Sequence, residues 1–214
     1  MDRIAAVLTG DLIASTDAGP VATDRAINTL SGAARRLSDW AGADTRFTRN
    51  RGDGWQIYLE FPGLVLRGAL LLTAALRTSE TGLASRVSAA IGRVNRLGDD
   101  GLSAANGEAF TIAGQNLDSM PRGAKLCIGG TQPVGPWPEA IFDLVDWQSH
   151  RWSSEQAEAV ALALDPEAPT QAELASRLGI TRQALQARLQ TAGFSALQES
   201  LRAFESQNWN LRWP

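Results

Sequence analysis

Two aspartates, each beside glycine and a strand-like segment, are the residues of this sequence best suited to chemistry. Asp11 follows a glycine at the end of the apolar run 4–9, and Asp53 lies between two glycines just before the apolar run 55–59. Carboxylates at the ends of neighbouring strands are ligands for a hard divalent cation, and such a cation commonly binds phosphate. The alternative is that these Gly-Asp and Asp-Gly steps are only turns.

The elements that must position these aspartates are predicted from hydrophobic periodicity. Along the chain we expect strand, helix, strand, strand, helix, strand, helix and strand. Their ranges are 4–9, 20–40, 45–50, 55–61, 64–78, 85–94, 108–120 and 125–128. Residues 97–106 are rich in Gly, Asp and Ser and are expected to form a loop. This order predicts an α+β domain over residues 1–130, in which helices pack on a sheet.

The composition changes after residue 130. Residues 131–150 contain three prolines and predict a connector. Residues 151–205 show only helical signals and predict an all-α C-terminal domain, and residues 206–214 predict a tail without a regular pattern. The expected fold class is therefore α+β with an additional all-α domain at the C-terminal end.

The segment 170–185 has the pattern of a helix-turn-helix. Thr170 and Glu173 match a capping box at a helix start. Gly179 suits a tight left-handed turn, and Thr181 suits the cap of a second helix, whose exposed side chains would read base edges or contact phosphates. The candidate DNA-binding residues are Arg177, Thr181, Arg182, Gln183, Gln186 and Arg188. Such units also serve as dimerisation or docking modules, and that alternative stays open.

Charge and composition restrict the setting in which the chain works. The net charge of −3 predicts no general affinity for nucleic acid, so any DNA contact must be local. Cys127 is the only cysteine, which excludes an internal disulfide and favours a reducing compartment. The first residues lack the apolar segment of a signal peptide, and the apolar stretch 64–76 is too short to cross a bilayer. We therefore expect a cytoplasmic protein without a membrane partner.

The order and spacing of these motifs resemble the SatD family. The matching segments are 10–13, 51–56, 86–94 and 106–110, and the resemblance extends over most of the chain, including the helix-turn-helix. SatD-like proteins in turn are similar to class III nucleotidyl cyclases. The resemblance implies a ferredoxin-like, cyclase-like sheet with packed helices.

The cyclase resemblance also implies a set of site residues. Asp11 and Asp53 match the two metal ligands, which implies bound Mg²⁺ or Mn²⁺. The implied contacts to nucleotide phosphates come from Leu12, Ile13, Thr16, Arg49 and Arg51. Gln115 stands where cyclases have an arginine that stabilises the transition state, and its amide carries no charge. Loss of such a donor costs on the order of a hundredfold or more in rate.

Three hypotheses follow from these residues. In the first, the protein is a regulator whose degenerate cyclase-like domain binds a divalent metal or a nucleotide, and whose helix-turn-helix binds DNA. A homodimer is expected here, because cyclase sites form between protomers and helix-turn-helix proteins read paired half-sites. In the second, the protein is an active nucleotidyl cyclase or nucleotidyltransferase with two metal ions on Asp11 and Asp53. In the third, it is an interaction scaffold.

Overall fold

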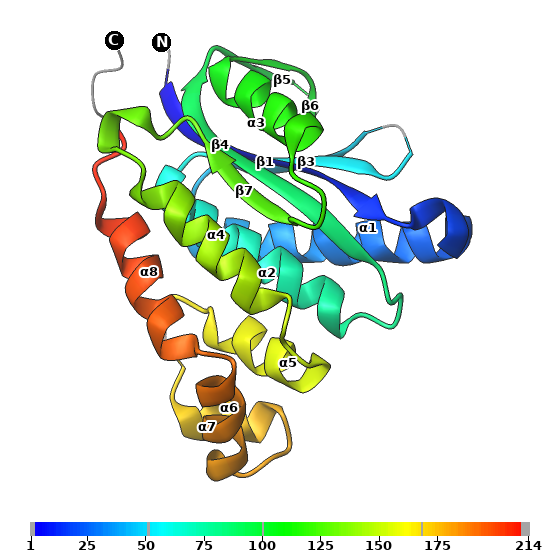
Figure 1. The fold of residues 1–214 in the computed structure, drawn as a ribbon, viewed down its shortest axis with the longest axis vertical. Helices are drawn as coiled ribbons and strands as arrows, with labels where there is room; N and C mark the ends of the chain where they lie inside the picture. Colours follow the sequence, from blue (N-terminus) through cyan, green and yellow to red (C-terminus); the bar gives the residue numbers. More distant parts are fainter. Residues whose placement is uncertain (1–2, 51, 100, 168, 211–214) are drawn as a thin grey trace.

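A five-stranded mixed sheet is the centre of the molecule, with the strand order β2-β3-β1-β4-β7 (Figure 1). The computed structural model describes residues 3–50, 52–99, 101–167 and 169–210. The strands are β1 (Arg3–Ile13), β2 (Thr45–Arg49), β3 (Gly54–Leu59), β4 (Ala84–Val94) and β7 (Leu126–Gly129). The central strand β1 is antiparallel to β3 and β4, and β7 is parallel to β4. The predicted α+β architecture, a sheet with packed helices, is confirmed.

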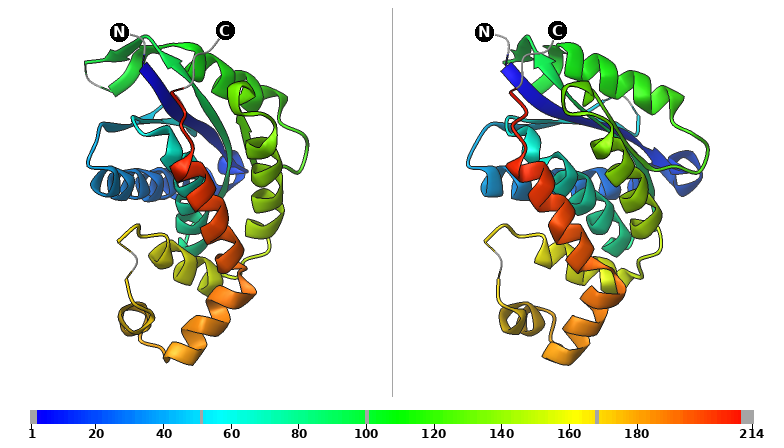
Figure 2. Two further views of the ribbon diagram at one scale, coloured as in Figure 1. Left: turned by 90° about the vertical axis from the view of Figure 1, so that its left-hand side faces the viewer. Right: turned by 60° about the vertical axis from the view of Figure 1, so that its left-hand side comes forward.

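Helices cover both faces of this sheet (Figures 1 and 2). Helices α1 (Ser15–Ala41) and α2 (Val65–Thr78) pack on one face, and α3 (Glu108–Ser119) packs on the other. Side chains alternate along β1, so Leu8 joins the core under α1 and α2 while Val7 joins the core under α3. Burial on both faces explains why β1 has a continuous apolar run instead of an alternating one.

The start of α1 differs from the prediction by a few residues. A helix was expected from Pro20, but α1 begins at Ser15 and is kinked at Gly19, where φ is 81°. Pro20 follows this kink and opens the longer part of the helix, because its missing N–H needs no partner there. Ala14 precedes the helix with a φ of 58°, a left-handed conformation that is uncommon for a residue with a side chain.

Two segments that were expected to be irregular contain regular structure. The expected loop over residues 97–106 is largely a two-stranded ribbon of β5 (Arg96–Gly98) and β6 (Gly101–Asn106). It is held to the sheet where the backbone N–H of Leu102 donates to the Thr48 hydroxyl. The expected connector 131–150 contains helix α4 (Trp137–Ser149). Its prolines precede or open that helix, where proline is tolerated.

The C-terminal helices are α5 (Ser154–Ala163), α6 (Gln171–Arg177), α7 (Arg182–Thr191) and α8 (Phe194–Ser206). Helices α5 and α8 belong to the same core cluster as α2 and the sheet, through side chains such as Val160 and Phe204. The aromatic ring of Phe204 packs edge-on against that of Trp137, with ring centroids 4.9 Å apart. Side chains of α5 and α8, together with Trp152 just before α5, therefore share one core with the sheet and α2.

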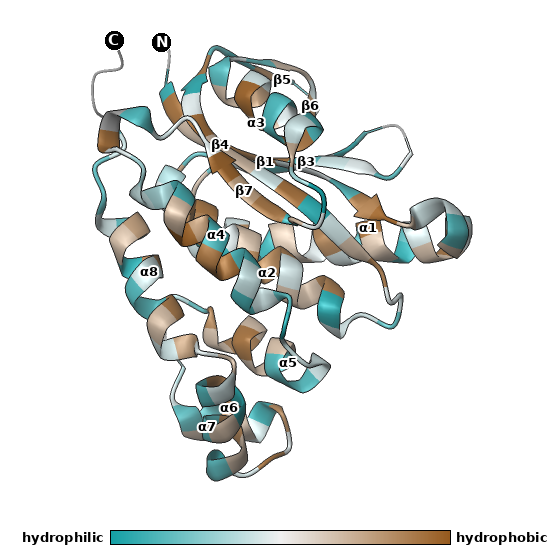
Figure 3. Ribbon diagram, viewed as in Figure 1, coloured by the Kyte–Doolittle hydropathy of each residue, from teal (hydrophilic) through white to brown (hydrophobic). Residues whose placement is uncertain are grey.

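Helices α6 and α7 project from the main core at the C-terminal end. They form a smaller cluster with α5, which contains Ala159, Leu174, Ala175 and Leu185. Figure 3 shows hydrophilic segments along α6 and α7. Trp209, in the expected irregular tail, is buried in the main core. Within the described ranges, no helix combines the length and the apolarity needed to cross a membrane.

An arginine on α2 links the sheet layer to the C-terminal helices. The Arg67 side chain is 9% exposed, and its Nε lies 2.6 Å from Oε1 of Glu205 on α8. Its guanidinium also donates to the carbonyl of Leu164, the residue that ends α5. A buried guanidinium needs such partners, because leaving its donors unpaired is costly. Arg67 therefore fixes α5 and α8 against α2.

Candidate functional site

The two predicted metal ligands lie at one end of the sheet. In the register of β1 and β3, Asp11 is opposite Gly54, the residue that follows Asp53. The Gly10-Asp11 step is not a turn, because it lies inside β1. A Cβ at position 10 would be 2.5 Å from the Trp55 ring and 2.1 Å from the carbonyl oxygen of Arg86, so glycine is required there by close packing.

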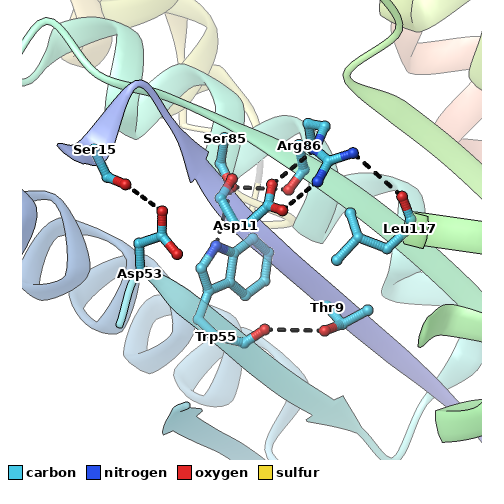
Figure 4. Close-up of polar contacts among 8 residues, drawn as sticks. All are labelled: Thr9, Asp11, Ser15, Asp53, Trp55, Ser85, Arg86 and Leu117. Atoms are coloured by element: carbon cyan, nitrogen blue, oxygen red, sulfur yellow. Dashed lines mark hydrogen bonds and ion pairs between the residues drawn. The ribbon is translucent and has the colours of Figure 1, made fainter. Parts of the chain in front are cut away.

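Asp11 is engaged by an arginine of the neighbouring strand. Arg86 is the register partner of Asp11 on β4. Its Nε donates to Oδ1 of Asp11 over 2.9 Å, and its Nη2 donates to Oδ2. Figure 4 shows this two-point contact and a further bond from Nη1 to the carbonyl of Leu117, 3.4 Å away. The hydrogen bond to Asp11 raises the pKa of Arg86 above its ordinary value, so the guanidinium stays charged.

Asp53 has a different partner. The hydroxyl of Ser15, the first residue of α1, donates to Oδ2 of Asp53. In Figure 4 the two carboxylates point towards different residues, Asp11 towards Arg86 and Asp53 towards Ser15. By the alternation along β1, Asp11 faces the side of the sheet that α3 covers, whereas Ser15 belongs to a helix on the opposite side.

The residues expected to bind metal and phosphate are divided between two surface hollows. The first hollow is lined by Asp11, Leu12 and Ile13 together with Arg86 and residues 120–125. The second hollow is lined by Ser15, Thr16, Gly19, Pro20, Thr23, Arg49, Gly52 and Asp53. Arg51 lies outside the described residues. The exposed Gln115 on α3 lines neither hollow.

This arrangement does not fit the implied divalent cation. Both oxygens of Asp11 accept from a cationic side chain, which occupies the place that Mg²⁺ or Mn²⁺ would need. Among residues 3–50, 52–99, 101–167 and 169–210, no three or more His, Cys, Asp or Glu side chains gather into a group able to hold a metal. Arg49, a predicted phosphate contact, instead pairs with Asp24 at 2.8 Å.

Sequence reasoning missed Arg86 and Ser15, the partners of the two aspartates. The sequence predicted that Arg86 lies in a strand, but only the register of β4 with β1 shows that Arg86 is opposite Asp11. Ser15 was missed because the helix was expected to begin five residues later. Ser85, next to Arg86, receives a hydrogen bond from the Trp55 indole at 3.0 Å and donates to the Asp11 carbonyl at 2.7 Å.

A second candidate site is the exposed face of α6 and α7. The hydroxyl of Thr170 accepts from the N–H of Glu173, and that of Thr181 accepts from the N–H of Ala184, so both predicted helix caps are confirmed. Gly179 between the helices has a φ of 64°, the left-handed turn expected there. A shallow hollow on this face is lined by Gln171, Arg182, Gln183 and Gln186.

The remaining predicted DNA contacts differ in their surroundings. Thr181, Arg182, Gln183 and Gln186 are exposed, as is Arg177 at the end of α6. Arg188 is half-buried, and its Nη1 lies 3.3 Å from Oε2 of Glu158 on α5. The sequence between residues 174 and 198 contains no acid, so this partner comes from an earlier helix that folding brings alongside. Arg188 is therefore engaged within the protein.

Comparisons with known proteins give similarity to parts of solved cyclase structures. No protein-family model and no curated protein matches the chain, so membership of the SatD family stays a prediction. A bacterial light-regulated adenylyl cyclase is 16% identical over 60% of this chain and 43% of its own, with a TM-score of 0.44. The guanylyl cyclase Cya2 is 16% identical over 60% of this chain and 75% of its own, with a TM-score of 0.45.

Proposed function

We propose that the protein is a cytoplasmic regulator that binds DNA through α6 and α7, acting as a helix-turn-helix. The observation that carries this proposal is the exposed hollow of Arg182, Gln183 and Gln186 beside Gln171, the first residue of α6. Arginine and glutamine are the side chains that pair with guanine and adenine edges in the major groove. In this proposal α7 is the recognition helix.

The backbone of α6 and α7 favours the same role. Both helices begin with a side-chain cap, and the turn between them is closed by Gly179 in a left-handed conformation. Leu174, Ala175 and Leu185 fix the two helices against α5, so the exposed face is presented by a rigid unit. Arg177, at the end of α6, supplies a further positive charge for a phosphate. We leave Arg188 out of the interface because it pairs with Glu158.

Two copies of the chain would suit this function. One recognition helix reads only a few base pairs, and dimers gain affinity by binding two half-sites about one helical turn apart. We therefore propose that the protein acts as a homodimer on paired sites.

The competing function is a nucleotidyl cyclase or nucleotidyltransferase with metal ions on Asp11 and Asp53. The observation in its favour is that these aspartates lie at one end of neighbouring strands. Two observations count against it. Arg86 already binds the carboxylate of Asp11, and Gln115 lines neither hollow.

Selection from a pool of genomic fragments tests the DNA-binding proposal. Wild-type protein is expected to enrich a defined sequence, and Gln186→Ala is expected to weaken or broaden that preference, because a base contact is lost. Arg202→Ala on α8 is the control, since its pair with Glu199 is exposed and lies outside the hollow. The proposal would be contradicted if the wild-type protein enriched no sequence, or if Gln186→Ala enriched the same sequence to the same extent.

A further inference from the structure

A cavity of about 330 Å³ lies between the sheet and the helices that follow it. Its walls come from the end of α2, the starts of β4 and β7, the end of α4 and the first residue of α5. The cavity is separate from the α6–α7 face, with which it shares no lining residue. Its volume falls at the lower end of the range typical of small-molecule sites.

One wall of the cavity is apolar, and the other carries positive charge. The apolar lining residues are Leu76, Leu83, Ala84, Val87 and Leu126. The cationic lining residues are Arg77 and Lys125, and the imidazole of His150 also lines the cavity. Within the described parts of the chain, the ammonium of Lys125 makes no hydrogen bond or ion pair. Lys125 is half-buried, and an ammonium whose N–H groups have no protein acceptor is a ready contact for an anion.

The one acid in the cavity, Asp146, is already occupied. Its carboxylate accepts from the backbone N–H of Leu126 at 3.0 Å and from that of Lys125 at 3.2 Å. Its Oδ1 also lies 3.5 Å from Nε2 of His150. These contacts hold α4 against the start of β7 and offset the carboxylate charge locally. Arg77 and Lys125 supply two positive charges against the one carboxylate of Asp146, so the lining keeps a net positive charge.

The cavity is also fixed at its edge. Arg77, at the end of α2, donates from Nε to the carbonyl of Trp152 over 2.9 Å. This bond uses one nitrogen of the guanidinium and ties α2 to the segment that leads into α5. The Arg77 guanidinium is therefore held beside the cavity before a ligand arrives, which lowers the entropy cost of binding.

We propose that this cavity binds a small organic anion, with a carboxylate against Lys125 and Arg77 and an apolar body against Leu76 and Leu83. A fully apolar ligand would leave the Lys125 ammonium without an acceptor. An inorganic anion would leave the apolar lining residues without a contact. The cavity size suits a ligand of roughly ten non-hydrogen atoms. This inference is independent of DNA binding, because it rests on other residues.

Benzoate and benzamide provide a matched pair of probes, since they share a shape and differ in charge. We expect benzoate, at about 10 mM, to shift the ring resonances of His150 saturably and to raise the melting temperature, because it binds the folded state. Benzamide at the same concentration should do neither. Equal effects of both probes, or no saturable shift with benzoate, would overturn the proposal.

Substitutions locate the bound anion. Lys125→Met keeps the apolar stem and the backbone bond to Asp146, and it should weaken benzoate binding about tenfold, as should Arg77→Met. Arg122→Met is the control, because Arg122 lines only the neighbouring hollow that contains Asp11. A loss of affinity in Arg122→Met with none in Arg77→Met would place the anion in that hollow and refute the assignment.

Discussion

Arg86 and Asp11 are register partners on adjacent strands, and their side chains form a two-point ion pair at the end of the sheet. The guanidinium stands where a metal ion would have to approach the carboxylate. A fixed cation of this kind satisfies Asp11 without any bound metal. The ion pair with Arg86 therefore gives Asp11 a structural role, and the hydrogen bond from Ser15 gives Asp53 one.

Divalent cations should leave the stability of the wild-type protein unchanged. A metal that bound only the folded state would raise the melting temperature, but both oxygens of Asp11 already accept from Arg86. Thermal unfolding with and without Mg²⁺ or Mn²⁺ measures this directly. A rise in the wild type that disappears in Asp11→Asn would contradict our interpretation.

Removal of Arg86 should destabilise the protein only modestly. Arg86→Gln leaves Asp11 without its cation, but the two side chains are 36% and 29% exposed, so water compensates for much of the loss. We expect a decrease of about 1 kcal/mol in the free energy of unfolding, measured with a denaturant. A decrease several times larger would show that the pair is buried more deeply than the structure indicates.

Stability should depend on pH through the only histidine. Burial lowers the pKa of His150 below its ordinary value of 6.5. Repulsion by Lys125, Arg151 and Arg77 lowers this pKa further, whereas attraction to Asp146 raises it. The unfolded chain therefore binds this proton more readily than the folded one. The free energy of unfolding should fall as the pH decreases below about 6.5, and should be independent of His150 above it.

The control for this prediction is His150→Gln, which should remove that pH dependence. Burial raises the pKa of Asp146, an effect of the opposite sign, and loss of the His150 attraction raises it further in the variant, so the two proteins are compared near pH 6.5, the ordinary histidine pKa. Because the sequence has one histidine, its ring resonance gives the pKa without assignment. A measured pKa above 6.5 would mean that attraction to Asp146 outweighs burial.

The turn between α6 and α7 should favour glycine over alanine. Gly179 has a φ of 64°, and no atom lies within 4 Å of a Cβ added there, so Gly179→Ala suffers from backbone strain alone. We expect a loss of about 1 kcal/mol in the free energy of unfolding. Gly114 in α3 also has open space around its Cβ, and there alanine should stabilise by up to about 1 kcal/mol. A neutral Gly179→Ala would contradict the left-handed turn.

Local signals in the sequence predicted much of this fold because they act over a few residues. The caps at Thr170 and Thr181 and the turn at Gly179 depend only on neighbouring backbone groups, so the sequence was enough to predict them. The helix α4 was missed because its prolines suggested a connector, although proline is compatible with a first turn. The ribbon of β5 and β6 is short and lacks a clear alternation.

The arrangement of the site was harder to predict because it depends on distant residues. Asp11 and Asp53 were found by their positions at strand ends, but their partners follow from strand register and from the early start of α1. Glu158 likewise meets Arg188 only after α5 packs on α7. Such pairings join residues that no sequence spacing relates, so they are visible only in three dimensions.

The link between α2 and α8 should be essential for stability. Arg67→Met leaves Glu205 and the carbonyl of Leu164 without their partner, which should cost about 2–3 kcal/mol in the free energy of unfolding. Arg202→Met, on the same helix α8, breaks an exposed pair with Glu199 and should cost less than about 0.5 kcal/mol. Denaturant titrations of both variants compare the two effects. Equal losses would argue against a buried role for Arg67.

The salt dependence of DNA affinity tests the central claim most directly. At about 50 mM salt we expect the wild-type protein to bind duplex DNA, with an affinity that falls steeply as salt increases. Arg177→Ala should weaken binding and reduce the slope of log K against log salt by about 1, because Arg177 is the proposed phosphate contact, while Arg202→Ala should change neither quantity. Absence of binding at low salt, or equal slopes and equal affinities for wild type and Arg177→Ala, would contradict the claim.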